Sequence, residues 1–101
     1  MMNENLNALG QLLGCYFHQD WPDEYESDLA ALRAIVREEP KEQVMAGLKE
    51  IDQLLAVPQS EIDFRMIMVD KVGCYFDPAS QGMTYGDWLR KVREVFSGAN
   101  M

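Results

Sequence analysis

Lysine and arginine are missing from residues 1–30 of this chain, although the whole sequence contains nine of them. Against these nine stand 17 acidic residues, so the formal net charge is −8 and the pI is near 4.4. Nucleic acids bind to basic surfaces, and the charge balance therefore argues against a direct nucleic-acid ligand. An anionic membrane surface is disfavoured for the same reason, whereas a basic protein partner fits the charge well.

Long hydrophobic runs are also missing. The longest uncharged apolar stretches fall far short of the roughly 20 residues that a membrane-spanning helix needs. The beginning of the sequence has no basic region followed by an apolar stretch, the pattern of a secretory signal peptide. We therefore expect a cytoplasmic protein whose residues 1–101 form one domain around a single core.

Cysteine and histidine are scarce, with two cysteines and one histidine in the sequence. In the cytosol Cys15 and Cys74 should be thiols, although their matching contexts leave a disulfide between them as an alternative. Cys15, His18 and Asp20 are the residue types of a nucleophile, a base and an orienting group. They are close in sequence, and no glycine-rich loop is present to form an oxyanion pocket. We therefore expect no enzyme, and His18 suits the negative end of a helix.

The sequence also lacks the spacing of metal ligands. Zinc sites use paired cysteines or histidines at short intervals, and neither pairing occurs. An EF-hand starting at Asp20 would need glycine at its sixth position and glutamate at its twelfth, where this chain has Tyr25 and Ala31. Phosphate-binding and dinucleotide-binding motifs are absent. We therefore predict no bound metal and no organic cofactor.

Apolar residues recur mostly at helical spacing, which predicts an all-α domain of about five helices. Ser27, Ser60 and Thr84 are suited to cap the starts of three of them. Residues 18–26 and 77–83 are expected to be loops. The five helices are expected from about Glu4 to Phe17, Ser27 to Pro40, Pro40 to Pro58, Ser60 to Gly73, and Thr84 to Phe96.

The segment after Pro58 allows two interpretations. Ile62, Met66, Val69 and Val72 or Gly73 lie along one face of a helix that begins at Ser60, which predicts a helical segment. Residues 64–69 are also rich in Phe, Ile and Val, which favour strands. A single strand would have no partner in this chain, so the helix is preferred.

One tetrapeptide, Gly-Cys-Tyr-Phe, occurs twice, at residues 14–17 and again at residues 73–76. Each copy is followed directly by an acidic stretch that favours a turn. The spacing is longer than the periods of solenoid repeats, so the recurrence does not indicate a repeat protein. We predict instead that each copy ends an apolar helix in a Tyr-Phe pair.

The segment from His18 to Asp28 places carboxylates around two aromatic side chains. Aromatic anchors surrounded by steering charges are typical of protein interfaces. For Trp21 we favour packing on Phe17 over contact with a partner, because the indole would then cover the end of the first helix. We predict that the residues that contact a basic partner are Asp20, Asp23, Glu24, Tyr25, Glu26 and Asp28.

Three strings carry a family resemblance: Tyr-Phe-His-Gln-Asp-Trp at 16–21, Gly-Cys-Tyr-Phe-Asp-Pro at 73–78, and the segment 84–89. From Leu6 to about Phe96 the chain resembles the CdiI-type immunity proteins of bacterial contact-dependent growth inhibition. The resemblance implies a cytosolic, non-enzymatic inhibitor of the toxin domain at the C-terminus of a CdiA-type effector. Many such toxin domains are nucleases, which would be basic. The alternative is a small acidic adaptor or regulator that binds another basic protein.

Overall fold

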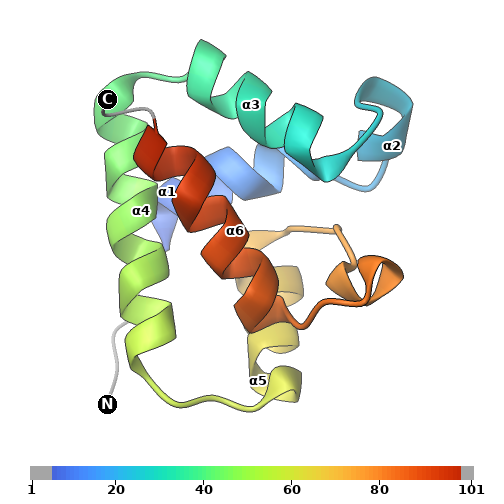
Figure 1. Cartoon of the computed structure of the whole chain (residues 1–101), viewed down its shortest axis with the longest axis vertical. Coiled ribbons are helices and arrows are strands. Elements are labelled where there is room, and N and C mark those ends of the chain that lie inside the picture. Colours follow the sequence, from blue (N-terminus) through green and yellow to red (C-terminus); the bar gives the residue numbers. More distant parts are fainter. Residues whose placement is uncertain (1–5, 99–101) are drawn as a thin grey trace.

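The computed structural model describes residues 6–98, and this part of the chain is helical and contains no strand (Figure 1). The predicted all-α class is confirmed, and the alternative of a strand at residues 64–69 is wrong. Within the described residues no helix has the length and apolar character needed to cross a membrane. The elements are α1 (Asn7–Leu9), the π-helix η1 (Gly10–Gly14), α2 (Trp21–Glu24), α3 (Asp28–Glu38), α4 (Lys41–Ala56), α5 (Glu61–Met66), the π-helix η2 (Ile67–Val72), the 3₁₀-helix η3 (Pro78–Gln81) and α6 (Tyr85–Gly98).

The predicted caps form. The hydroxyl of Ser27 accepts a hydrogen bond of 3.1 Å from the backbone N–H of Ala30 at the start of α3. Ser60 accepts one from the N–H of Asp63 at the start of α5, again at 3.1 Å. At the start of α6, the hydroxyl of Thr84 accepts a hydrogen bond of 3.1 Å from the N–H of Asp87. Each hydroxyl satisfies an N–H group that has no partner inside its helix, which fixes where the helix begins.

Helix α6 is the centre of the packing, because it contacts α3, α4 and α5 (Figure 1). Its inward face carries the buried side chains of Tyr85, Trp88, Leu89, Val92 and Phe96, and Trp88 in its first turn is completely buried. The first helical segment, α1 with η1, packs on α4. The largest fully buried side chains of the core are Trp88, Phe17, Phe96, Leu9, Leu12, Leu13, Leu32, Ile35, Ile51, Met68, Leu89 and Val44.

Several of the expected boundaries differ from the structure, and the predicted loop of residues 77–83 contains the 3₁₀-helix η3. The first helix begins at Asn7, continues as the π-helix η1, and remains helical to Tyr16. Its expected start at Glu4 lies outside the described residues. The predicted loop of residues 18–26 contains the short helix α2, which has Pro22 in its first turn. A proline is accommodated there because the N–H group that it lacks would have no helical partner.

Of the apolar stripe predicted along α5 and η2, only Val72 reaches the core. The side chains that reach the core are Phe64, Ile67, Met68 and Val72. Ile62 and Met66 point outward, with exposed fractions of 72% and 56%. This helical segment is apolar on two sides, and periodicity alone does not reveal which side the remainder of the chain covers.

The two Gly-Cys-Tyr-Phe copies lie against each other. The N–H of Tyr75 donates a hydrogen bond of 2.8 Å to the carbonyl of Phe17. The rings of Phe17 and Phe76 are 5.8 Å apart, and both are buried. The first copy is helical to its tyrosine, one residue short of the predicted end at Phe17. The second is not, because η2 ends at Val72 and the chain leaves the helix through Gly73 at a φ of 79°.

Candidate functional site

Four of the predicted contact residues lie exposed on and around α2: Asp20, Asp23, Glu24 and Glu26. Their local backbone is fixed by two hydrogen bonds, from the N–H of Trp21 to the carbonyl of His18 and from the N–H of Tyr25 to the carbonyl of Trp21. Asp23 and Glu24 therefore lie on a short helical turn, which Asp20 precedes and Glu26 follows. With no lysine or arginine before residue 33, this turn has no cation close to it in sequence.

Asp28 was also predicted as a contact residue, but it belongs to the interior and is only 2% exposed. Its carboxylate accepts hydrogen bonds from Trp88 Nε1 at 2.9 Å, Lys91 Nζ at 2.9 Å and Gln81 Nε2 at 3.1 Å. Burial raises the pKa of Asp28, but these three donors outweigh it, and the net pKa lies below the usual value. Asp28 therefore ties the end of the acidic segment to η3 and α6. The partner Lys91 is too distant in sequence for local patterns to have shown this.

Trp21 packs as predicted. Its ring centroid lies 5.2 Å from that of Phe17 and 5.7 Å from that of Phe76, both edge-on. Such pairs contribute roughly 0.5–1.5 kcal/mol beyond their buried area. The indole therefore holds α2 against the core, which fixes the position of the neighbouring carboxylates.

Two further carboxylates, which the sequence analysis missed, belong to the same surface. The hydroxyl of Tyr16 donates to Glu39 Oε2 at 2.8 Å and to Glu38 Oε1 at 3.1 Å. The ring of Tyr16 lies 6.3 Å from that of Tyr25, so it connects the end of α3 to the segment after α2. One sequence signal was available, because acidic residues at the C-terminal end of a helix oppose its dipole and cost stability.

Burial and nearby glutamates raise the pKa values of two tyrosines, Tyr16 and Tyr25. Burial first, and then hydrogen bonds to Glu39 and Glu38, raise the pKa of Tyr16 well above its usual value. Burial, Glu38 and Glu24 raise the pKa of Tyr25, while Arg37 opposes them. Glutamate carboxylates therefore lie close to a half-buried aromatic pair. We refer below to the acidic surface, formed by Tyr16, Asp20, Asp23, Glu24, Tyr25, Glu26, Glu38 and Glu39.

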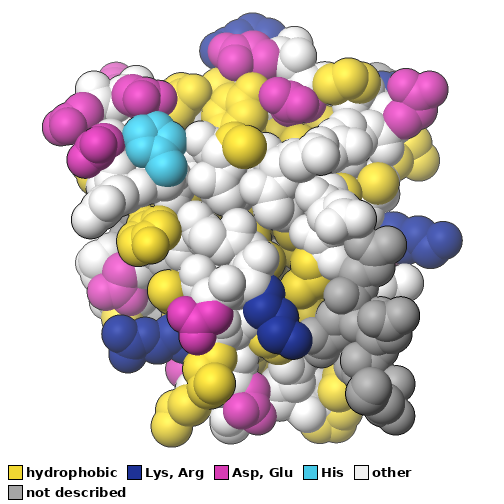
Figure 2. Space-filling model, turned by 180° about the vertical axis from the view of Figure 1, so that it is seen from behind, with side chains coloured by type: hydrophobic (Ala, Val, Ile, Leu, Met, Phe, Trp, Pro, Cys, Tyr) yellow, Lys and Arg dark blue, Asp and Glu magenta, His cyan; other side chains and the backbone are white. Residues whose placement is uncertain are grey.

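Figure 2 shows one edge of this surface. Several Asp and Glu side chains gather beside the imidazole, and further carboxylates follow along the same edge with apolar groups between them. This arrangement of charge around partly exposed aromatic rings suits recognition of a basic protein.

The imidazole of His18 is fully engaged within this segment. Its Nε2 lies 3.1 Å from Glu24 Oε2, and its Nδ1 accepts a hydrogen bond of 3.1 Å from the backbone N–H of Asp20. Both nitrogens therefore face partners other than Cys15. Cys15 and Cys74 are free cysteines, the first exposed and the second buried. Across residues 6–98, no three His, Cys, Asp or Glu side chains are grouped so that they could hold a metal ion.

The fold and surface define a small acidic α-helical protein with the features of a protein-binding module. The family model of the CdiI immunity protein matches residues 5–96, and the chain belongs to that family. No match is found among curated proteins. Among solved structures, a chain of the crystal structure of the CdiA-CT/CdiI complex from Y. kristensenii 33638 is 25% identical, with a TM-score of 0.83. The alignment covers 90% of the present chain and 97% of that one.

Proposed function

We propose that this chain is a cytoplasmic immunity protein that binds and neutralises the C-terminal toxin domain of a CdiA-type effector, without catalysis of its own. The observation that carries the proposal is membership of the CdiI immunity protein family over residues 5–96. The likeness to a chain of a CdiA-CT/CdiI complex supports it.

The charge distribution suggests how the inhibitor would work. The proposed toxin is a nuclease, and such an enzyme needs a basic groove for the phosphates of its substrate. The acidic surface would occupy that groove and exclude the nucleic acid. Electrostatic attraction would speed the encounter, to as much as about 10⁸ M⁻¹s⁻¹ at low salt. Fast association is useful because the inhibitor must act before a toxin molecule turns over its substrate.

Within the acidic surface, the proposed contacts are Asp20, Asp23, Glu24, Tyr25 and Glu26, joined by Glu38 and Glu39. Tyr25 is the proposed anchor, because it is half-buried and its ring lies against Tyr16. An aromatic ring between carboxylates favours a lysine or arginine side chain of the partner. Asp28 is withdrawn from the contact set, since its oxygens already serve Trp88, Lys91 and Gln81.

The test uses the toxin domain encoded by the effector gene next to this one. Co-expression with the full chain should restore growth of cells that produce the toxin, and the two purified proteins should form a stable complex. Absence of both rescue and complex would refute the proposal.

A charge-reversal variant tests the surface. The triple substitution Asp23→Lys, Glu24→Lys and Glu26→Lys should slow association roughly tenfold or more at low salt, and weaken its salt dependence. The matched control is Glu42→Lys, Asp52→Lys and Glu94→Lys, three exposed acids on α4 and α6 with the same change in net charge. Equal association rates for the two triple variants would place the contact elsewhere.

A further inference from the structure

An apolar stripe remains uncovered on the outer side of α5 and η2. Ile62 is 72% exposed and Met66 is 56% exposed, while Val69 is partly exposed one turn further on. Tyr75, which follows η2, is 53% exposed. Single exposed apolar residues are ordinary, but a contiguous group of them marks an interaction site.

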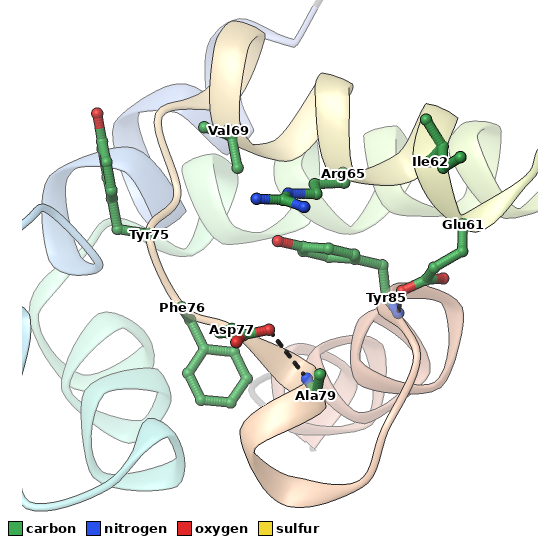
Figure 3. Close-up of a pocket in the computed structure, with 9 residues that line it drawn as sticks. All are labelled: Glu61, Ile62, Arg65, Val69, Tyr75, Phe76, Asp77, Ala79 and Tyr85. Atoms are coloured by element: carbon green, nitrogen blue, oxygen red, sulfur yellow. Dashed lines mark hydrogen bonds between the residues drawn. The ribbon is translucent and has the colours of Figure 1, made fainter.

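A groove of about 580 Å³ lies beside this stripe. One wall is the helical side with Ile62, Arg65 and Val69, and the other is the chain from Tyr75 to Ala79 (Figure 3). The ring of Tyr85, at the start of α6, lies beneath the Arg65 side chain in this view. The lining is mainly apolar and aromatic, and its volume suits one or two side chains of a partner.

The acidic groups of the groove already accept hydrogen bonds from the chain, whereas its arginine forms no ion pair among residues 6–98. Glu61 Oε2 accepts a hydrogen bond of 2.7 Å from the N–H of Tyr85, and Asp77 Oδ1 accepts one of 3.1 Å from the N–H of Ala79. Arg65 forms no ion pair with any Asp or Glu of residues 6–98. Its guanidinium extends along the groove between Val69 and Tyr85. A guanidinium presents several donors in a plane, and a carboxylate is the group that it binds best.

The groove adjoins the acidic surface. Tyr75, at its edge, donates its N–H to the carbonyl of Phe17, the residue directly before His18. Phe76, in its lining, packs on Trp21 of α2. One partner could therefore cover both surfaces. A stable protein complex buries on the order of 800 Å² on each partner, which is more than one short acidic turn offers, and its strongest contacts are apolar, aromatic and arginine side chains.

We propose that the toxin domain that docks on the acidic surface also inserts an apolar side chain into this groove and sets a neighbouring carboxylate against Arg65. This inference rests on the proposed function. It assigns the two surfaces different tasks: the acidic surface accelerates the encounter, and the groove slows dissociation. A second copy of this chain is the poorer occupant, because two molecules of net charge −8 repel each other.

The test compares the dissociation of the cognate toxin domain from four variants of the full chain. Ile62→Ser and Arg65→Glu should each raise the dissociation rate roughly tenfold or more, with little effect on association. Met45→Ser and Lys49→Glu, at exposed positions of α4, remove a similar apolar side chain and reverse a similar charge. They should change the rate by less than about twofold, as expected of positions outside an interface. All four side chains are exposed, so thermal unfolding should confirm that each variant is folded.

The outcomes separate the two proposals. If the toxin binds wild type and the groove variants dissociate no faster than the α4 controls, the groove assignment is overturned and the proposed function stands. If Arg65→Glu tightens binding, a carboxylate does not occupy the groove and the assignment is again overturned. If wild type forms no complex, both proposals fail. Sedimentation of the free chain should show a monomer, and a dimer that Ile62→Ser disrupts would identify a second copy as the occupant.

Discussion

The same four residues occur at 14–17 and at 73–76, and the structure uses them in different ways. Phe17 and Phe76 are alike, since both are buried and their rings are neighbours. The other positions diverge. Cys15 is exposed where Cys74 is completely buried. Tyr16 is half-buried against two glutamates, whereas Tyr75 is exposed at the edge of the groove.

The difference shows that local sequence decided little here. Gly14 lies inside a helix, and a Cβ at this position would collide with the carbonyl oxygen of Val72. Gly73 is instead the left-handed residue through which the chain leaves η2. The first glycine is needed for a close approach of two backbones and the second for its positive φ. The two copies therefore have complementary roles in one contact.

The largest expected effect breaks this contact. Gly14→Ala places a methyl group against a backbone carbonyl that cannot move aside, and should lower the free energy of unfolding by about 3 kcal/mol. Gly73→Ala should lower the free energy of unfolding by only about 1 kcal/mol. Its Cβ would lie 4.0 Å from the Cα of Gly14, an ordinary contact, so the loss comes from holding alanine at a left-handed φ. Urea unfolding followed by tryptophan fluorescence measures both. Equal losses would contradict the division of roles.

A second prediction concerns the acidic stretches that follow the copies. Asp28, at the end of the first, accepts from Gln81 in the 3₁₀-helix that follows the second. Asp28→Asn should cost about 2 kcal/mol at neutral pH, because the donors Trp88, Lys91 and Gln81 lose a charged acceptor that is itself buried. The exposed Asp23→Asn should change stability by less than about 0.5 kcal/mol.

The pH dependence of Asp28 has a defined sign. Its pKa is lowered in the folded state, so its contribution is present above the ordinary aspartate pKa of about 3.9 and is lost as the pH falls through the folded pKa. Stability measured from pH 7 down to acid should therefore fall less steeply for Asp28→Asn than for wild type. Parallel curves would show that Asp28 does not carry this dependence.

The cysteines should differ in reactivity. Burial raises the pKa of the Cys74 thiol to about 12, although a hydrogen bond from the backbone of Phe76 acts in the opposite direction. We expect iodoacetamide at mildly alkaline pH to label Cys15 in the folded protein and Cys74 only after unfolding. Cys74→Ser should cost about 1–2 kcal/mol because it buries a hydroxyl, and Cys15→Ser should be nearly neutral. Mass spectrometry of the labelled peptides decides the first point, and early labelling of Cys74 would contradict its burial.

The smallest effect is expected from the tyrosines. Tyr16→Phe removes the hydrogen bonds to Glu38 and Glu39 and should cost about 1 kcal/mol, whereas Tyr75→Phe should cost nothing measurable. The raised pKa of Tyr16 means that the unfolded chain ionises first. Its contribution is therefore complete below about pH 10 and is lost as the pH rises through the folded pKa. Above about pH 10, stability should fall less steeply with pH for Tyr16→Phe than for wild type, and equal slopes would contradict the assignment.

Most of the fold could be predicted from the sequence because its signals are local. Ser27, Ser60 and Thr84 cap the helices that they were expected to begin. The failures are of another kind. The outward turn of Ile62 and Met66 depends on which side of a doubly apolar helix the remaining chain covers, and no local pattern contains that information.

The candidate site likewise contains residues that could be predicted from the sequence and residues that could not. The exposed acids of residues 20–26 followed from composition alone, and Trp21 packs where an indole beside Phe17 was expected to pack. Asp28 was misplaced because its partner Lys91 lies on the last helix. Glu38 and Glu39 were missed because a tyrosine distant in sequence brings them into the surface.

The close approach at Gly14 has a consequence for selectivity. The acidic surface follows the first copy, and one wall of the groove follows the second, so this close approach helps to set the spacing between the two surfaces. A toxin with suitable charge but the wrong distance between its basic patch and its apolar protrusion could satisfy one surface and not both. The contact at the two glycines would then contribute to selectivity, because partners would be distinguished by the distance between their binding groups as well as by their charge.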